Sequence, residues 1–283
     1  MEEQKYMLTE ERIEEYGKEL LERERSNATI QKYLYSLKQL QNFIGKEELA
    51  KEKIIIWKKQ LLEKYSAATV NSYLAAVNGF FGFMGWKGLV VNPVKIQKSL
   101  FLDEEKELTK EEYMRLVRTA EHEKNERLAL ILQTICATGI RVSELKFITA
   151  EAVFSGRAQI DNKGKRRMVF LPEKLCKLLK KYLKKKKLTA GAVFVTRFGK
   201  PMDRSNIWRD MKALCEAAGV GPGKVFPHNL RHLFARTYYT LEKDLSRLAD
   251  ILGHSNVNTT RIYTAESGSV HARQMERMGL IVT

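Results

Sequence analysis

Several features of secreted and membrane proteins are missing from this sequence of 283 residues. No apolar run approaches the roughly 20 residues that span a bilayer, and the opening MEEQKYMLTE lacks the basic start and apolar stretch of a signal peptide. Only three cysteines occur, and no C-x-x-C pair is present. Cys136, Cys176 and Cys215 stand in apolar, helix-like surroundings, as small core residues in a reducing compartment do. We therefore expect a soluble, cytoplasmic protein without a membrane partner.

Two further absences limit the chemistry. The phosphate-binding pattern G-x-x-x-x-G-K-[ST] does not occur, so no P-loop nucleotide site is expected. His228 and His232 have the i, i+4 spacing of the two histidines in the zinc motif H-E-x-x-H, but Asn229 replaces the catalytic glutamate of that motif and no third ligand presents itself. We accordingly expect no metal and no other cofactor.

Acidic residues are the scarcer charge, with 34 Asp and Glu against 50 Lys and Arg and a net charge of +16. Residues 1–100 contribute only +3 of this charge, and residues 101–283 contribute +13. A basic field concentrated on one part of a chain indicates a polyanionic partner such as nucleic acid. The run KKYLKKKKL at 180–188 is by itself typical of the exposed face and end of a helix. Charge alone therefore favours nucleic acid as the partner and leaves the activity open.

Two N-terminal segments repeat each other at a spacing of forty residues: SNATIQKYLYSLKQLQNFIG from Ser26 and SAATVNSYLAAVNGFFGFMG from Ser66. In each, apolar residues recur on one helical face and a glycine closes the segment. A small helical domain over residues 1–100 is expected. The Ser/Thr-rich starts predict either ordinary helix N-caps or sites for a phosphate at the positive end of the helix dipole. The candidate DNA-binding residues here are Thr29, Lys32 and Thr69.

The second domain is expected over residues 107–283. The stretch SLFLDEEKELTKEEY at 99–113 indicates a linker and then a helix start, with Thr109 and Glu112 in capping-box spacing. Helical patterns follow, interrupted by RAQID, the turn NKGK and RRMVFLP, which predict a hairpin, and AVFVT at 192–196 predicts another short strand. The expected fold is mainly α with a small antiparallel β-sheet.

One predicted helix concentrates proton-carrying and cationic groups. In FPHNLRHLFARTYYTL, at 226–241, the apolar face is formed by Leu230, Leu233, Phe234, Tyr238 and Leu241. His228, Arg231 and His232 share the face expected to point away from the core. An arginine offers a bidentate fork to phosphate and a histidine donates hydrogen bonds or moves a proton, so this face predicts an anion site.

Three other segments hold candidates with two open interpretations each. In CATGIRVSEL, Gly139 ends a helix, Arg141 stands at the turn, and Glu144 follows one helical turn later. Arg141 either faces a cleft, or forms an ordinary surface ion pair with Glu144. Lys163 lies in NKGK, and turns are often rich in Lys and Gly. In LGHSNVNTTRIYT, Tyr263 follows His254 by nine positions and is either a core aromatic residue or a nucleophile.

In their order, these segments resemble the boxes of the tyrosine recombinases, also called phage integrases. ATGIRVSEL is similar to the family's T-G-[LI]-R-x-S-E-L, PHNLRH to its H-x-L-R-H, and LGHSNVNTTRIY to its L-G-H-x-x-x-x-T-T-x-x-Y. NKGKRR resembles the family's hairpin, and the two N-terminal helices resemble its helical core-binding (SAM-like) domain. The resemblance implies a DNA-clamp domain followed by a mixed α/β catalytic domain of the recombinase type.

The resemblance also implies an activity and a site. A tyrosine would attack the scissile phosphate, give a 3′-phosphotyrosine intermediate, and so serve integration, excision or resolution of DNA elements without a metal. The implied catalytic residues are Tyr263 as nucleophile, Arg141 and Arg231 as phosphate clamps, Lys163 in the hairpin, His228 and His254. The implied supporting residues are Glu144 and His232. Because the hairpin turn is one residue short, Lys165 is an alternative to Lys163; Lys165 and Arg166 are further candidate DNA-binding residues.

By the same resemblance, the partner would be double-stranded DNA with a specific recombination site. The chain would act as a homo-tetramer on DNA, be a monomer or weak dimer when free, and pack residues 264–283 on a neighbouring copy. About 25 residues precede Ser26, too few for the arm-binding domain of many phage integrases, which favours an Xer-like or small mobile-element enzyme. A type IB topoisomerase and a catalytically decayed architectural DNA-binding protein stay open as alternatives. The target sequence and the biological task are not specified.

Overall fold

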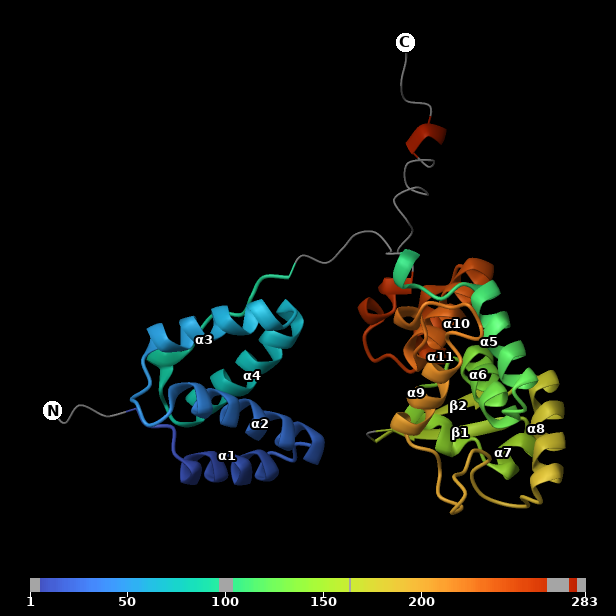
Figure 1. Ribbon diagram of the computed structural model, residues 1–283, viewed down its shortest axis with the longest axis horizontal. Coiled ribbons are helices and arrows are strands. Elements are labelled where there is room, and N and C mark those ends of the chain that lie inside the picture. The colour runs from blue at the N-terminus through green and yellow to red at the C-terminus, as the bar shows by residue number, and fades with distance from the viewer. Residues whose placement is uncertain (1–5, 97–103, 163, 264–274, 279–283) are drawn as a thin grey trace, which may run out of the picture. The chain divides into compact units, whose positions relative to one another are not determined.

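The computed structural model describes residues 6–96, 104–162, 164–263 and 275–278. The chain divides into two compact units, Met1–Lys98 and Ser99–Thr283, shown in Figure 1 and described separately below. Helices dominate both, and a two-stranded antiparallel sheet lies in the second, which confirms the predicted fold class. Within the described ranges, no helix is long and apolar enough to cross a membrane.

The N-terminal unit consists of four helices around an apolar core. They are α1 (Glu10–Glu22), α2 (Asn27–Ile44), α3 (Lys51–Lys64) and α4 (Ala67–Phe83). The repeated segments form α2 and α4, which pack against each other. Ser26 and Ser66 are their N-caps: each hydroxyl accepts a hydrogen bond from the backbone amide three residues later. The ordinary capping interpretation of these starts is therefore confirmed.

Helix α6 is the centre of the C-terminal unit. The helices are α5 (Lys110–His122), α6 (Glu126–Thr138), α7 (Ala150–Ser155), α8 (Glu173–Lys186), α9 (Arg204–Ala213), α10 (Pro227–Glu242) and α11 (Leu245–Leu252), with short 3₁₀ turns at Val142–Phe147, Val257–Thr259 and Arg261–Tyr263. Helix α6 buries eight residues and packs against α5, α8 and α10. The predicted capping box opens α5: Thr109 Oγ1 accepts from the Glu112 amide and the Glu112 carboxylate accepts from the Thr109 amide.

Strands β1 (Arg157–Asn162) and β2 (Lys165–Phe170) form the hairpin. Ala158, Ile160 and Val169 lie in the core, and the intervening side chains point outward. The strand predicted at 192–196 is wrong. Val193 and Phe194 are buried, but this segment makes only single bridges, because the chain turns back after Thr196 through Gly199, whose φ is +74°.

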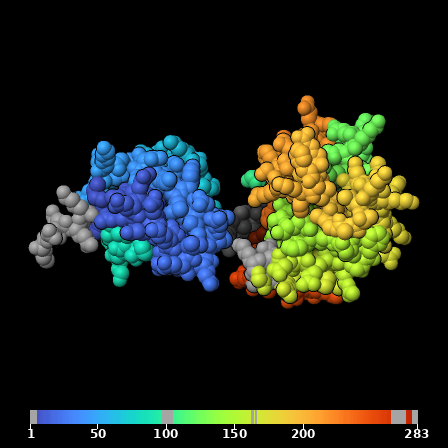
Figure 2. Space-filling view, turned by 90° about the horizontal axis from the view of Figure 1, so that it is seen from below, coloured from blue at the N-terminus to red at the C-terminus, as the bar shows by residue number. Residues whose placement is uncertain are grey.

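Helix α8 carries the lysine run. Its apolar side chains face the core, and its C-terminal lysines are mostly exposed, which confirms the predicted solvated helix face. In Figure 2 its yellow surface adjoins the yellow-green surface of α7 and the hairpin. The three cysteines are free; Cys176 and Cys215 are buried and Cys136 is partly buried.

Candidate active site

A left-handed glycine brings the end of α6 close to α10. Gly139 caps α6 with φ +65°, and a Cβ added there would lie 2.4 Å from Cδ1 of Phe234. Any other residue would combine a strained backbone with a steric clash. The chain then turns at Arg141, which is the N-cap of the 3₁₀ turn that follows and keeps about a third of its side chain exposed.

Glu144 is buried between two arginines. Its side chain is 1% exposed and accepts from Arg141 Nη1 at 3.0 Å and from Arg167 Nη2 at 2.8 Å. It also accepts from the Arg141 amide at 2.8 Å. The ordinary surface-pair interpretation of Arg141 and Glu144 is therefore wrong, because the Glu144 carboxylate is buried. Its hydrogen bonds orient the guanidinium groups of Arg141 and Arg167.

Arg167 was missed by the sequence interpretation. It lies on β2, two residues before the buried Val169, so strand alternation places it on the inner face, whereas Arg166 is exposed and pairs with Asp161 at 3.2 Å. Arg167 Nε also donates to the Ile251 carbonyl at 3.2 Å. The signal was the period of two in RRMVFLP, which puts Arg167 and Val169 on one face.

Arg231 on α10 is fully buried, although its helix face was expected to point away from the core. It is 1% exposed, and α11 and the segment up to Tyr263 pack against its helix and contact its guanidinium. Its guanidinium donates to the carbonyls of Gly139 at 2.5 Å and Leu252 at 2.8 Å. Desolvation, and then the nearby Arg141 charge, lower the pKa of Arg231 to about 10, so it stays protonated at neutral pH. Leu241, which was expected on the core-facing apolar side of α10, is 75% exposed, so this part of the prediction is wrong.

His254 lies just beyond α11 and is fixed through both ring nitrogens. Its Nε2 is 2.9 Å from Arg231 Nη2 and its Nδ1 is 2.8 Å from Thr260 Oγ1. Because arginine only donates, Nε2 is the acceptor and Nδ1–H donates to Thr260. Desolvation, followed by the Arg231 charge, lowers the pKa of His254 to about 4, so the ring is neutral at pH 7.

Tyr263 is both buried and next to these cations. Its side chain is 4% exposed and packs with Ala235, Leu248 and Leu252. The His254 ring stacks on it at a centroid distance of 6.3 Å, and the His232 ring meets it edge-on at 5.1 Å. Burial raises the pKa of Tyr263 while the charge of Arg231 and a hydrogen bond with it act in the opposite direction, and the net shift is upward. The phenol is therefore protonated at neutral pH.

His228 stands at the solvent side of the site. The ring is exposed, and its centroid is 4.6 Å from that of His232. Partial desolvation, and then the charges of His232 and Arg231, lower the pKa of His228 to about 4. His232 thus lies between His228 and Tyr263, and His228 is neutral and able to accept a proton at pH 7.

The structure therefore gathers most of the predicted site from distant parts of the sequence. The residues brought together are Arg141, Glu144, His228, Arg231, His232, His254 and Tyr263. Lys163 lies outside the described residues, as does the side chain of Lys165. No group of three or more potential metal ligands occurs among the residues that the structure describes.

Two of the three candidate DNA-binding residues of the N-terminal unit line a groove of that unit. Lys32 and Thr69 line it between α2 and α4, with Tyr35 and Tyr73. The Thr69 hydroxyl is 3.1 Å from the Ser66 hydroxyl, and Thr29 makes the same contact with Ser26 at 2.8 Å. Both threonines therefore take part in helix caps.

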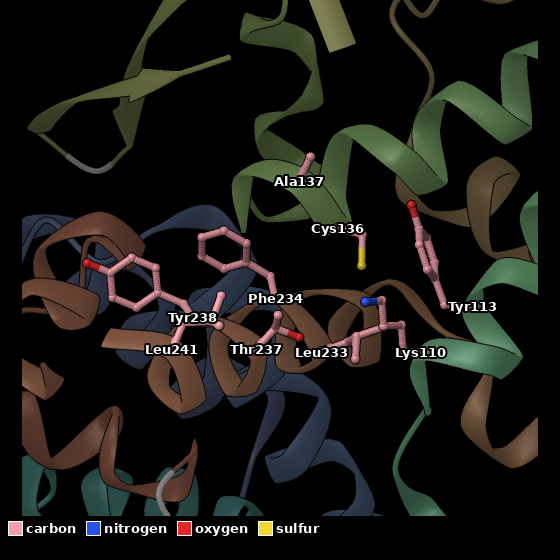
Figure 3. A pocket seen from close by; sticks show the side chains of 9 residues that line it. All are labelled: Lys110, Tyr113, Cys136, Ala137, Leu233, Phe234, Thr237, Tyr238 and Leu241. Carbon is pink, nitrogen blue, oxygen red and sulfur yellow. The ribbon is translucent and has the colours of Figure 1, made fainter. Parts of the chain in front are cut away.

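An apolar pocket of about 300 Å³ adjoins the site where α10 meets α5 and α6. Figure 3 shows its lining: Lys110, Tyr113, Cys136, Ala137, Leu233, Phe234, Thr237, Tyr238 and Leu241. Burial raises the pKa of the Cys136 thiol to about 12, so this cysteine is an unreactive wall residue. Phe234 links the pocket to the site, because the same ring packs over Gly139.

Two family models match the chain. Residues 106–269 match the phage integrase family, and residues 13–88 match the phage integrase N-terminal SAM-like domain. Among curated proteins, tyrosine recombinase XerD of Staphylococcus saprophyticus is 35% identical over 148 residues, which cover 49% of this chain and 50% of that protein. XerD of Pseudomonas aeruginosa is 34% identical over 160 residues, covering 52% and 53%. The matched region thus spans about half the length of these relatives.

Solved structures extend the likeness over both units. A XerA recombinase crystal structure is 26% identical, covers 96% of this chain and 98% of its own, and superposes with a TM-score of 0.53. A lambda integrase dimer bound to a core site is 17% identical, covers 92% and 96%, and gives a TM-score of 0.74. The second likeness concerns the fold alone.

Proposed function

The chain belongs to the phage integrase family, and from this membership and the geometry of its site we propose that it is a site-specific DNA recombinase. It cuts and rejoins DNA strands through a 3′-phosphotyrosine intermediate, with residues 107–283 as the catalytic domain and residues 1–100 as a DNA-clamp domain. The observation that carries the proposal is the placement of a protonated tyrosine beside the buried Arg231 guanidinium and the neutral His254 ring, in a cluster that Arg141 and His228 complete and that is drawn from three separate segments.

The two arginines are suited to hold one phosphate. Arg231 is held by backbone carbonyls, which carry no formal charge, and Arg141 shares Glu144 with Arg167. Guanidinium groups fixed in this way neutralise the non-bridging oxygens and the charge that develops on them in the transition state. This is the task that a metal performs in many nucleases, so the mechanism requires no metal.

Tyr263 needs such compensation. A free tyrosine with a pKa near 10 is ionised to about 0.1% at pH 7, a deficit of roughly 4 kcal/mol for the phenolate, and burial makes the deficit larger here. As Tyr263 Oη bonds to phosphorus, we assign His228 as the acceptor of the phenol proton. The bond from phosphorus to the 5′-oxygen breaks, and we assign Lys163 as the donor of a proton to that oxygen.

Rejoining requires no nucleotide. The phosphotyrosine bond keeps the energy of the phosphodiester, so a 5′-hydroxyl can attack it and release Tyr263. We propose double-stranded DNA with a specific recombination site as the substrate, a homo-tetramer as the active assembly on DNA, and the cytoplasm as the location. With most of the charge on residues 101–283, DNA affinity should fall steeply as salt rises.

The test uses a duplex that carries the cognate site and a nick, so that the short fragment with the free 5′-hydroxyl diffuses away and the covalent complex accumulates. A denaturing gel should show a protein–DNA band with the wild type, none with Tyr263→Phe, and an undiminished band with Tyr239→Phe. A wild type that binds the site but gives no band would contradict the proposal and favour an architectural protein. Relaxation of a supercoiled plasmid by single protomers, without exchange between two duplexes, would favour a topoisomerase.

A further inference from the structure

A partly buried carboxylate outside every motif contacts the site. Glu107 lies between the 3₁₀ turn Glu104–Lys106 and α5, with a side chain 14% exposed. Its Oε1 is 3.3 Å from Nδ1 of His232, and its Oε2 is 3.4 Å from Nη2 of Arg236. Burying a carboxylate costs free energy unless it is paired, so these contacts account for its position.

Side chains on one face of α10 hydrogen-bond to the backbone on both sides of Glu107. Asn229 Nδ2 donates to the Lys106 carbonyl at 2.7 Å, and Arg236 Nη2 donates to the Leu108 carbonyl at 2.9 Å. Asn229, His232 and Arg236 are spaced by three and four residues, which places them on one helical face. The backbone of residues 106–108 is therefore fixed relative to α10, and the carboxylate reaches His232 from a defined position.

The contact between Glu107 and His232 determines the orientation of the His232 ring relative to Tyr263. Burial alone would raise the pKa of Glu107, but the hydrogen bond from His232 and the charge of Arg236 outweigh it and lower the pKa below its usual range. The ionised carboxylate can only accept, so His232 donates through Nδ1–H. The ring is then held at one orientation, in which it meets the Tyr263 ring edge-on at 80°. Its Nε2 is buried without a hydrogen-bond partner in the described parts of the chain.

We propose that Glu107 is a positioning residue for the nucleophile and acts through His232, an inference that rests on the proposed recombinase activity. The carboxylate fixes the tautomer and plane of the His232 ring, and this ring fixes the plane of the Tyr263 phenol against the Arg231 side of the site. Reaction rates depend steeply on such placement, since about 1 Å of displacement can cost 10²-fold.

A matched control lies five residues away. Glu112 is 15% exposed and pairs with Lys224 at 3.0 Å, so it resembles Glu107 in exposure and in pairing. Its side chain hydrogen-bonds to Lys224 and Thr109, and none of the described site residues is among these partners. Glu107→Gln and Glu112→Gln each replace one oxygen of a half-buried carboxylate by an amide group. A merely structural role predicts similar consequences for both, whereas positioning predicts a cleavage defect only for Glu107→Gln.

The experiment measures single-turnover cleavage of the nicked duplex at saturating full-length protein, together with DNA affinity and thermal melting. Glu107→Gln should cleave about 10- to 100-fold more slowly with unchanged DNA affinity, and Glu107→Asp should recover part of the rate. Glu112→Gln should cleave at the wild-type rate. In a His232→Leu background, Glu107→Gln should slow cleavage by less than about twofold more, because the two residues act in series.

A second substrate separates the nucleophile from the leaving group. A sulfur at the bridging 5′ position leaves without a proton donor, so it rescues defects in protonation of the leaving group; the defect of Glu107→Gln should persist on it. Wild-type cleavage by Glu107→Gln, equal losses with Gln and Asp, or a full additional loss in the His232→Leu background would overturn the proposal. Absence of cleavage by the wild type would instead contradict the recombinase activity.

Discussion

The cores of the two units differ in the types of residue that they bury. Among the buried residues that the structure describes in the N-terminal unit, aromatic and aliphatic side chains dominate and Ser36 is the polar exception. The C-terminal unit also buries Glu144, Asn229, Arg231 and Thr260, all in or next to the site. Burying such groups lowers stability unless each is hydrogen-bonded. The N-terminal unit is thus stabilised by apolar packing, whereas the C-terminal unit loses some stability by burying a charged site.

The charges of the site are also divided between two arrangements. Glu144 forms ion pairs with Arg141 and Arg167, whereas Arg231 contacts neutral carbonyls and a neutral imidazole. Arg231 is therefore a fully buried cation among neutral partners, and the phenol of Tyr263 is its neighbour. An incoming phosphate would supply the negative charge that this arrangement lacks.

Truncation of Phe80 should have the largest effect on stability, confined to the N-terminal unit. Its ring is fully buried and packs edge-on against Tyr16 at 5.6 Å and Trp86 at 5.6 Å. Phe80→Ala should destabilise by about 3–5 kcal/mol. Hydrogen exchange on the full chain should show lost protection in α2 and α4 and normal protection in α6. Phe198→Ala, at an exposed position, should leave the protection of both units unchanged. Equal losses of protection in both units would contradict two independently packed cores.

Replacing the buried cation should affect chemistry instead. Arg231→Lys keeps the charge but cannot reach Gly139, Leu252 and His254 together, so single-turnover cleavage should fall by about 10²- to 10³-fold, as when one fixed transition-state donor is lost. DNA affinity should change little, because one phosphate contact is a small part of a large footprint.

The matched control for this variant is Arg127→Lys. Arg127 also donates to a backbone carbonyl, that of Val195 at 2.9 Å, but lies outside the site. Cleavage at the wild-type rate is expected from it. If Arg231→Lys lost affinity and cleavage in equal proportion, Arg231 would be a general DNA contact rather than a phosphate clamp.

Mild acid should distinguish the units by a smaller amount. His228 and His254 have folded-state pKa values lowered to about 4 from 6.5, so between these values the unfolded state binds more protons and stability falls as pH falls. Residues 1–98 contain no histidine. From pH 7 to pH 5 the free energy of unfolding of the C-terminal unit should fall by about 1 kcal/mol, a figure reduced because solvent screens these partly exposed rings. Hydrogen exchange, corrected for its intrinsic pH dependence, measures this change. A larger loss in the N-terminal unit would contradict this assignment.

Most of the architecture was predictable because local signals agree with the fold. The repeated segments become α2 and α4 with the expected serine caps, and Thr109 and Glu112 form the expected box. The segment at 192–196 was mispredicted because burial of Val193 and Phe194 gives the same apolar run as a strand, and the turn that prevents pairing depends on glycines outside the run.

The site was predictable only as far as its motifs reach. Glu107 carries no local pattern, and its partner His232 lies 125 positions away. Arg167 carries only the strand alternation that puts it on the inner face, and nothing in that alternation identifies its partner Glu144, 23 positions away. The burial of Arg231 also depends on α11 and the segment after it, which no periodicity within α10 reveals.

Mapping the covalent attachment tests the central claim most directly. The full-length protein is trapped on the nicked duplex, the DNA is trimmed by nuclease, and tryptic peptides are read by mass spectrometry. The nucleotide remnant should lie on the peptide that follows Arg261, IYTAESGSVHAR, and on Tyr263 within it. A remnant on Tyr238, Tyr239 or any other residue would contradict Tyr263 as the nucleophile and the account of the site built around it.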